Sequence, residues 1–228
     1  MMTTQFQDSI QDRLRHAVQA SLPCQAAPVQ LALGALLSAQ QEPVHALIAC
    51  SLDEGDPTLH VGAALDLVHI GLQRLHARVD AAPETAGAAA LLGTAGNVLA
   101  GDYLTSGAFK LLVHCNDLAV LQHVADAITQ CCELECTDMG RAEAKASARA
   151  RPMGGAAARA GAMLGGLDEA AQTLAQRYGE AMAAALLCGA AEAGRASLHA
   201  AALQAAQALQ DATGKTRPLE LARARLGG

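Results

Sequence analysis

The chain is 228 residues long, which is enough to bury a sizeable core in one domain spanning residues 1–228. Its 16 basic and 22 acidic residues give a formal charge of −6, which argues against nucleic acid as its main partner. Hydrophobic residues make up 52% of the chain and aromatic residues 2%, which favours close-packed helices over a sheet. The N-terminus is polar and the apolar stretches are interrupted before they reach spanning length. We therefore expect an all-α cytoplasmic protein with no membrane span.

The first predicted helix lies in residues 1–22, where apolar residues repeat at four-residue steps: Phe6, Ile10, Leu14 and Val18. Pro23 ends this pattern, because proline cannot continue a helix. Pro28 opens a second predicted helix that runs through Ala39. A third helix is predicted near Val44 to Leu52.

Residues Val61–Asp80 give the clearest helical pattern in the chain. The apolar face of this predicted helix is formed by Val61, Ala64, Leu65, Val68, Leu72, Leu75 and Val79. Polar residues beside it step by three and four and form one stripe: Asp66, His69, Gln73, His76 and Asp80. His76 and Asp80, one turn apart, could bind a divalent ion softer than magnesium. The alternative is a polar cavity wall or a solvated stripe.

Gly93–Val113 reads GTAGNVLAGDYLTSGAFKLLV and predicts a largely buried helix that contains Gly101, Asp102 and Tyr103. Another helix is predicted from Leu118 to about Met139. It carries three clustered cysteines: Cys131, Cys132 and Cys136. Packing cysteines are the favoured interpretation, with a partner contact or a zinc site as alternatives, although the paired short spacing of zinc knuckles is absent.

The remaining part of the chain begins with a basic, alanine-rich segment, Gly140–Pro152, which we interpret as a solvated loop containing Arg149. A long helix is predicted over Leu167–Glu192, with acidic residues in its first turn. Two short C-terminal helices are predicted within residues 195–228. The first covers Leu198–Ala212 and is capped by Gly214, and the second starts at Pro218.

The phrase NVLAGDYLTSGAF resembles the stretch that follows the first aspartate-rich motif of trans-polyprenyl diphosphate synthases, helical prenyltransferases that elongate allylic diphosphates. Asp66-Leu67-Val68-His69 matches their Glu-Leu-Ile-His type tetrad upstream, and Tyr178-Gly179 matches their Tyr-Gly pair downstream. The resemblance implies an isoprenoid-synthase-like antiparallel helical bundle, shortened at the C-terminus. The family-motif remnants that it implies are Asp66, His69, Asp80, Gly101, Asp102, Tyr103, Tyr178 and Gly179.

The same resemblance implies that the chemistry is lost. The family's first magnesium motif, Asp-Asp-x-x-Asp, falls on His76–Asp80, where only the last aspartate is kept, and its second falls on Leu186–Gly194, which holds none. Its basic diphosphate-binding motif falls on Pro23–Pro28 without a cation, and its Lys-Thr pair falls on Arg149-Ala150. Magnesium prefers oxygen ligands, so we expect no cofactor unless residual prenyltransferase activity keeps magnesium. Arg149 is then the one weak candidate for a substrate contact.

Three functions follow from these observations. The first is a non-catalytic regulatory or structural subunit in isoprenoid biosynthesis, resembling the small subunit of heteromeric synthases and docking on a catalytic synthase. The second is a divergent prenyltransferase that uses a partner's aspartates, or His76 and Asp80. The third is a homodimer that binds an apolar or isoprenoid ligand in the former substrate cavity.

Overall fold

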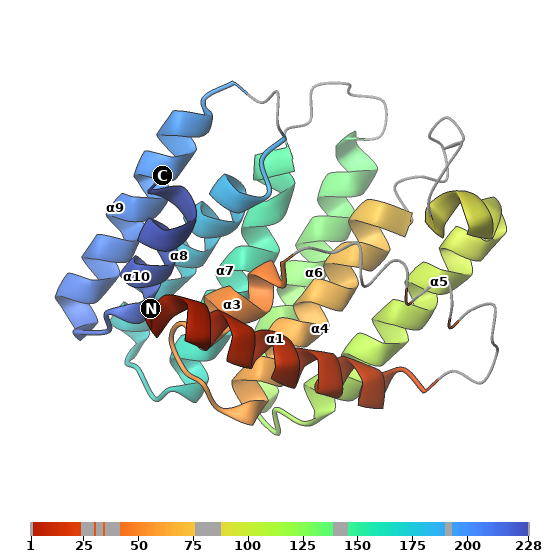
Figure 1. Cartoon of the computed structure of the whole chain (residues 1–228), viewed down its shortest axis with the longest axis horizontal. Helices are drawn as coiled ribbons and strands as arrows, with labels where there is room; N and C mark the ends of the chain where they lie inside the picture. The colour runs from red at the N-terminus through yellow and green to blue at the C-terminus, as the bar shows by residue number, and fades with distance from the viewer. Residues whose placement is uncertain are drawn as a thin grey trace.

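The structure is a computed structural model, and it describes residues 2–23, 30, 34, 42–75, 88–138, 146–189 and 193–227. Most of these residues lie in helices, and no strand occurs among them (Figure 1). In chain order the elements are α1 (Met2–Ser21), α3 (Val44–Cys50), α4 (Asp56–Ile70), the π-helical turn η1 (Gly71–Leu75), α5 (Ala88–Val113), α6 (Leu118–Asp138), α7 (Ala146–Leu164), α8 (Glu169–Leu186), α9 (Arg195–Thr213) and α10 (Arg217–Leu226). The prediction of an all-α fold is confirmed. The helix predicted from Pro28 falls mostly outside the described residues.

Two predicted boundaries are wrong. The described part of the segment interpreted as a basic loop, residues 146–152, belongs to α7, which begins at Ala146 and contains Pro152. Alanine favours the helix here, and the packing of α7 against α6 and α8 offsets the backbone hydrogen bond that proline removes. The long helix predicted to reach residue 192 ends at Leu186 instead, because the backbone leaves helical geometry at Leu187, just before Gly189.

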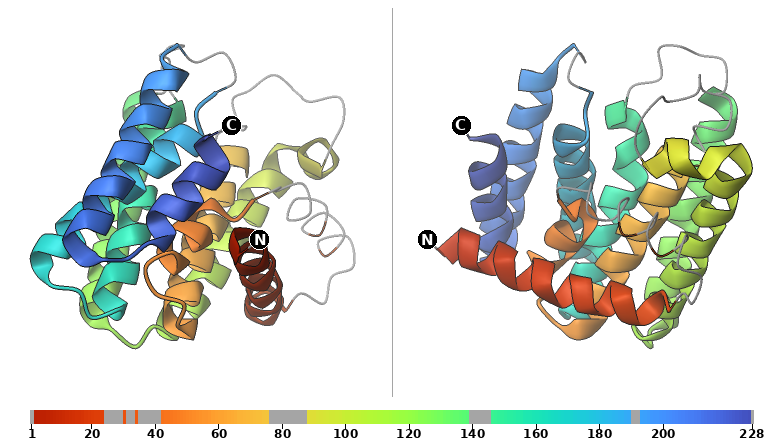
Figure 2. Two further views of the ribbon diagram at one scale, coloured as in Figure 1. Left: turned by 60° about the vertical axis from the view of Figure 1, so that its left-hand side comes forward. Right: turned by 45° about the vertical axis from the view of Figure 1, so that its right-hand side comes forward.

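The core is built around α3, a helix of seven residues that are all buried. Helices α4, α7 and α8 pack against it. On the outside, α1 crosses the bundle from the side of α9 and α10 towards α5, as Figures 1 and 2 show. The prediction of close-packed helices agrees with this arrangement, because the buried faces of α7 and α8 consist mainly of alanine and glycine.

Glycine allows α7 and α8 to approach closely where they cross. A Cβ atom added at Gly179 would lie 2.1 Å from the carbonyl oxygen of Gly154, and one added at Gly154 would lie 2.3 Å from the Cβ of Ala183. Real side chains cannot occupy that space without moving a backbone. Residue 179, a remnant of the Tyr-Gly pair, is therefore a packing position.

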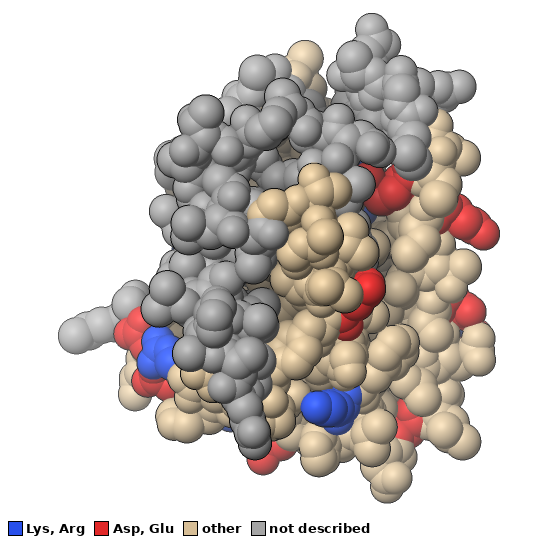
Figure 3. Space-filling view, turned by 90° about the vertical axis from the view of Figure 1, so that its right-hand side faces the viewer, with Lys and Arg blue, Asp and Glu red and all other residues tan. Residues whose placement is uncertain are grey.

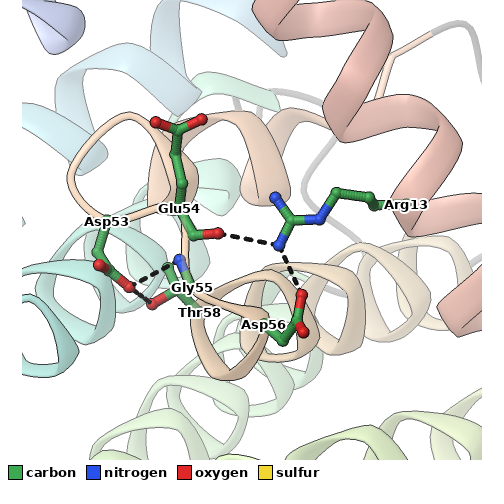
Figure 4. A network of polar contacts seen from close by, with 6 residues as sticks. All are labelled: Arg13, Asp53, Glu54, Gly55, Asp56 and Thr58. Carbon is green, nitrogen blue, oxygen red and sulfur yellow. Dashed lines mark hydrogen bonds and ion pairs between the residues drawn. The ribbon is translucent and has the colours of Figure 1, made fainter.

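The loop between α3 and α4 ties α1 to the bundle. The guanidinium of Arg13 donates to the carbonyl oxygen of Glu54 at 2.9 Å and to Asp56 Oδ1 at 2.7 Å (Figure 4). Within the loop, Asp53 accepts hydrogen bonds from the Gly55 amide and the Thr58 hydroxyl. These contacts fix the start of α4, the helix that carries the predicted polar stripe.

A helix that crosses a membrane must be long and apolar, and none of the described helices meets both conditions.

Candidate functional site

The first residue of the predicted polar stripe, Asp66, is buried in the core rather than facing a cavity or solvent. Its Oδ1 accepts hydrogen bonds from the backbone N–H of His45 at 3.0 Å and from His45 Nδ1 at 2.8 Å. Its Oδ2 accepts from the backbone N–H of Ala46 at 3.0 Å. Asp66 therefore caps the N-terminus of α3, which has no capping side chain of its own.

His69, one turn after Asp66, lies beside the same histidine, with the centroids of the His45 and His69 rings 5.3 Å apart. The side chain of His45 is completely buried, and its Nε2 has no hydrogen-bond partner among the described residues. The beginning of the stripe is thus a polar cluster of buried Asp66 and His45 with half-buried His69 beside them. The hydrogen bonds of Asp66 join α3 to α4.

The stripe continues at Gln73, in the π-helical turn η1, where three elements meet. Gln73 Nε2 donates to Oε1 of Glu135 on α6. The same oxygen lies 3.6 Å from Nε of Arg149 on α7, and the side chains of Arg149 and Glu135 are 25% and 22% exposed. Arg149, the weak candidate for a substrate contact, is therefore paired with a carboxylate of its own chain.

The last two residues of the stripe, His76 and Asp80, lie outside the described residues, so their proposed metal site stays a prediction. Among the described residues, no group of three histidine, cysteine, aspartate or glutamate side chains could hold a metal ion.

The three clustered cysteines have different surroundings. Cys131 is buried, and its thiol points to the carbonyl oxygen of Arg149 at 4.0 Å. Burial raises the pKa of the Cys131 thiol to about 12, so this thiol stays protonated at neutral pH. Cys132 and Cys136 are exposed on the outer side of α6.

The family-motif remnants in α5 differ in how far they are exposed. Gly101 is buried where α5 meets η1, since a Cβ atom added at Gly71 would lie 3.2 Å from the Gly101 carbonyl oxygen. Tyr103 is half-buried and Asp102 is exposed. The large exposed hydrophobic side chains found among the described residues all lie on α5 and at the start of α6: Leu99 (68% exposed), Phe109 (54%), Val113 (74%) and Leu118 (82%).

We call these four residues the α5–α6 apolar face. Figure 3 views the molecule from the side on which α5 lies, and most of its described surface there is uncharged. Large side chains of this kind are normally buried, so their concentration on one side indicates an interaction surface.

The Tyr-Gly pair in α8 faces the core. Tyr178 is completely buried, and its hydroxyl lies 3.3 Å from the hydroxyl of Ser51 at the end of α3. Burial, only partly offset by the Ser51 hydrogen bond, raises the pKa of the Tyr178 phenol well above its ordinary value. This phenol is consequently a neutral packing group.

No model of a known protein family matches the chain, and no curated protein matches it. Solved structures do match. A decaprenyl diphosphate synthase from Rhodobacter capsulatus is 15% identical, with a TM-score of 0.76, and the match covers 98% of this chain and 97% of that one. A polyprenyl synthase from Caulobacter crescentus, complexed with calcium and isoprenyl diphosphate, is 20% identical, with a TM-score of 0.69 and coverage of 98% and 83%.

A deletion mutant of the heterotetrameric geranyl pyrophosphate synthase from mint is 16% identical, with a TM-score of 0.70 and coverage of 97% and 98%. The chain has the all-helical isoprenoid synthase fold. At these identities the likeness establishes the fold alone, and this confirms the bundle predicted from the sequence resemblance.

The family resemblance implies magnesium held by carboxylates. The stretch matching the second aspartate motif begins at the end of α8 with Leu186, Leu187 and Cys188, and the Cys188 thiol lies 3.2 Å from the carbonyl oxygen of Ala185. Both oxygens of Asp66 are already engaged by α3. At the aspartate positions of this stretch the sequence has Ala190, Ala191 and Gly194. Magnesium takes hard oxygen ligands, so this stretch does not fit it.

Two residues that hold the predicted site residues in place, His45 and Glu135, were not identified from the sequence. His45 contacts Asp66 across 21 positions of the chain, and no spacing rule signals such a pair. Glu135 carried a signal, because it follows buried Cys131 by one turn and therefore lies on the inward face of α6. A carboxylate on that face requires a donor or a cation, and here Gln73 donates a hydrogen bond to it and Arg149 forms an ion pair with it.

Proposed function

We propose that this chain is a non-catalytic subunit with the isoprenoid synthase fold, which docks on a catalytic prenyl diphosphate synthase and changes that enzyme's stability or product length. The observation that carries the proposal is the stretch Leu186–Gly194, where Ala190, Ala191 and Gly194 stand at the positions of the aspartates that the family resemblance implies. Ionising an allylic diphosphate requires metal ions that neutralise the leaving group. A scaffold without the second carboxylate platform is unsuited to that step by itself.

The state of Arg149 supports the same conclusion. A guanidinium binds a diphosphate well when its donors are available for charge-assisted, bidentate contacts. Here the guanidinium is paired with Glu135, whose carboxylate also accepts from Gln73. A diphosphate entering this position would meet a like charge.

The α5–α6 apolar face supports a docking role. Burying a large apolar side chain contributes about 1.5 to 3 kcal/mol, and the four residues of this face are more than half exposed in the isolated chain. A heteromeric assembly exists for this fold, since the mint geranyl pyrophosphate synthase that the chain resembles is heterotetrameric. The partner we expect is therefore a catalytic synthase of the same fold, in the cytoplasm.

The experiment is co-purification of the tagged chain with an intact prenyl diphosphate synthase expressed in the same cells. We expect a stable complex, and we expect Val113→Glu in the apolar face to weaken it at least about tenfold, because the charge would be desolvated in the interface. Ala201→Glu, on the exposed side of α9, is the matched control and should leave the complex intact. A chain that only associates with itself, or a Val113→Glu chain that still binds the synthase, would contradict the proposal.

A further inference from the structure

Two histidines that are far apart in the sequence, His60 and His114, lie beside each other in the fold. His60 lies one turn into α4, and His114 lies in the turn that follows α5. Their imidazole ring centroids are 5.2 Å apart, and the ring planes are tilted by 44°. Because α4 and α5 pack against each other (Figure 1), the scaffold itself holds the two rings together.

The separation of these rings matches that of two imidazoles bound to one metal ion. In a tetrahedral zinc site the ion lies about 2.0 to 2.1 Å from each ligating nitrogen, which places the two ring centroids roughly 5.3 Å apart. Neither ring forms a hydrogen bond or an ion pair with another described residue, and Nδ1 of His60 is buried without a partner among them. Buried polar atoms normally have such a partner, so this pair has ring nitrogens to offer to a ligand.

The other close pair of rings, His45 and His69, shows why accessibility matters. Their centroids are 5.3 Å apart, but Nδ1 of His45 is bonded to Asp66 and the His45 side chain is completely buried. In contrast, His60 is half-buried and His114 is exposed. A hydrated ion can therefore reach this second pair and keep part of its water shell there.

The charges around His60 allow a metal ion to bind. Asp56, one turn earlier on α4, accepts a hydrogen bond from Arg13 at 2.7 Å and so offsets the positive charge of that guanidinium. Burial and then His114 lower the pKa of His60, and Asp56 opposes this shift more than Arg13 adds to it. The His60 ring is consequently neutral at neutral pH, and the neutral imidazole is the form that binds metal ions.

We infer that His60 and His114 form a two-imidazole site for a divalent transition-metal ion such as zinc or nickel, with water in the remaining coordination positions. Imidazole nitrogen suits these ions, whereas magnesium prefers oxygen. An ion bound here would link α4 to the end of α5, next to Val113 of the α5–α6 apolar face. The inference goes beyond the proposed function, because it holds whether or not the chain docks on a synthase.

The test is isothermal titration calorimetry of the tag-free chain with nickel chloride at neutral pH. Cys132→Ser and Cys136→Ser form the background, since these exposed thiols could bind nickel themselves. We expect one nickel ion per chain, and His60→Gln and His114→Gln should each weaken its binding at least about tenfold, because a single imidazole remains. Nickel should also raise the urea midpoint of the background chain and not that of His114→Gln, because an ion that binds only the folded chain stabilises it.

Two controls show whether the ion occupies this pair. His16→Gln removes an exposed imidazole from α1 and should leave nickel binding unchanged. A large excess of magnesium should not displace nickel, and displacement would indicate a carboxylate site and overturn the inference. The inference is also overturned if the background chain binds no nickel, or if His60→Gln and His114→Gln, both folded by circular dichroism, bind it as tightly as the background chain.

Discussion

Replacement of Asp66 by alanine should destabilise the fold by about 3 to 5 kcal/mol. The carboxylate accepts three buried hydrogen bonds, two from backbone N–H groups at the start of α3 and one from the ring of His45. Each buried donor left unsatisfied costs about 1 to 3 kcal/mol, so the loss of an acceptor for three donors should cost at least about 3 kcal/mol. Since domains of this kind are stable by only about 5 to 15 kcal/mol, this one change should remove a large fraction of the total.

The assay is urea unfolding followed by far-UV circular dichroism. Asp66→Asn keeps one acceptor oxygen and should cost less than Asp66→Ala, which gives a graded series even if the alanine variant does not fold. Asp8→Ala, on the exposed side of α1, is the matched control and should change the free energy of unfolding by less than about 0.5 kcal/mol. If Asp66→Ala and Asp8→Ala unfold at the same urea concentration, the capping of α3 by Asp66 is refuted.

Three further predictions concern packing, thiol reactivity and pH. Gly154→Ala should destabilise the fold by about 1 to 3 kcal/mol because its Cβ would meet the backbone of α8 at 2.5 Å, whereas Gly155→Ala meets only a glutamate and a glutamine side chain and should be milder in urea unfolding. Iodoacetamide at neutral pH should label Cys132 long before Cys131, as measured by mass spectrometry, since burial raises the pKa of Cys131 to about 12; equal labelling would contradict its burial. The pKa of His60 is lowered, mainly by burial and secondly by the neighbouring imidazole of His114. The unfolded chain therefore binds this proton more readily than the folded chain, and the stability of the fold should decrease as the pH drops through about 6.5. His60→Gln should reduce that fall in urea midpoints, and an unchanged pH dependence would argue against the shift.

Much of the fold could be predicted from the sequence because its helices carry strong local signals. The apolar four-residue steps of α1 and the glycine at 214, which has a positive φ at the end of α9, mark their helices clearly. The start of α7 was missed because its first turns are basic and alanine-rich, a composition that suits a solvated loop as well as a helix. In the folded chain, the packing of α7 against α6 and α8 favours the helix over the loop.

The candidate site was less predictable than the fold. Spacing placed Asp66 on a polar stripe, but only the tertiary structure shows that it turns inward to cap α3. Likewise, the sequence identified Arg149 as a cation and could not show that Glu135 neutralises it, because the two residues belong to different helices. Helical periodicity assigns a residue to a face of its own helix, whereas the partner of that face depends on how the helices are arranged.

The central claim is that this chain keeps the isoprenoid synthase fold, does not catalyse chain elongation by itself and acts through a partner. Its most direct test measures chain elongation from allylic and homoallylic diphosphates with magnesium, using the purified chain alone and then together with its catalytic synthase. We predict no product from the chain alone, and an altered product length or rate in the mixture that Val113→Glu abolishes and Ala201→Glu preserves. Elongation by the chain alone, lost in Asp80→Ala, would contradict the claim and identify a divergent prenyltransferase.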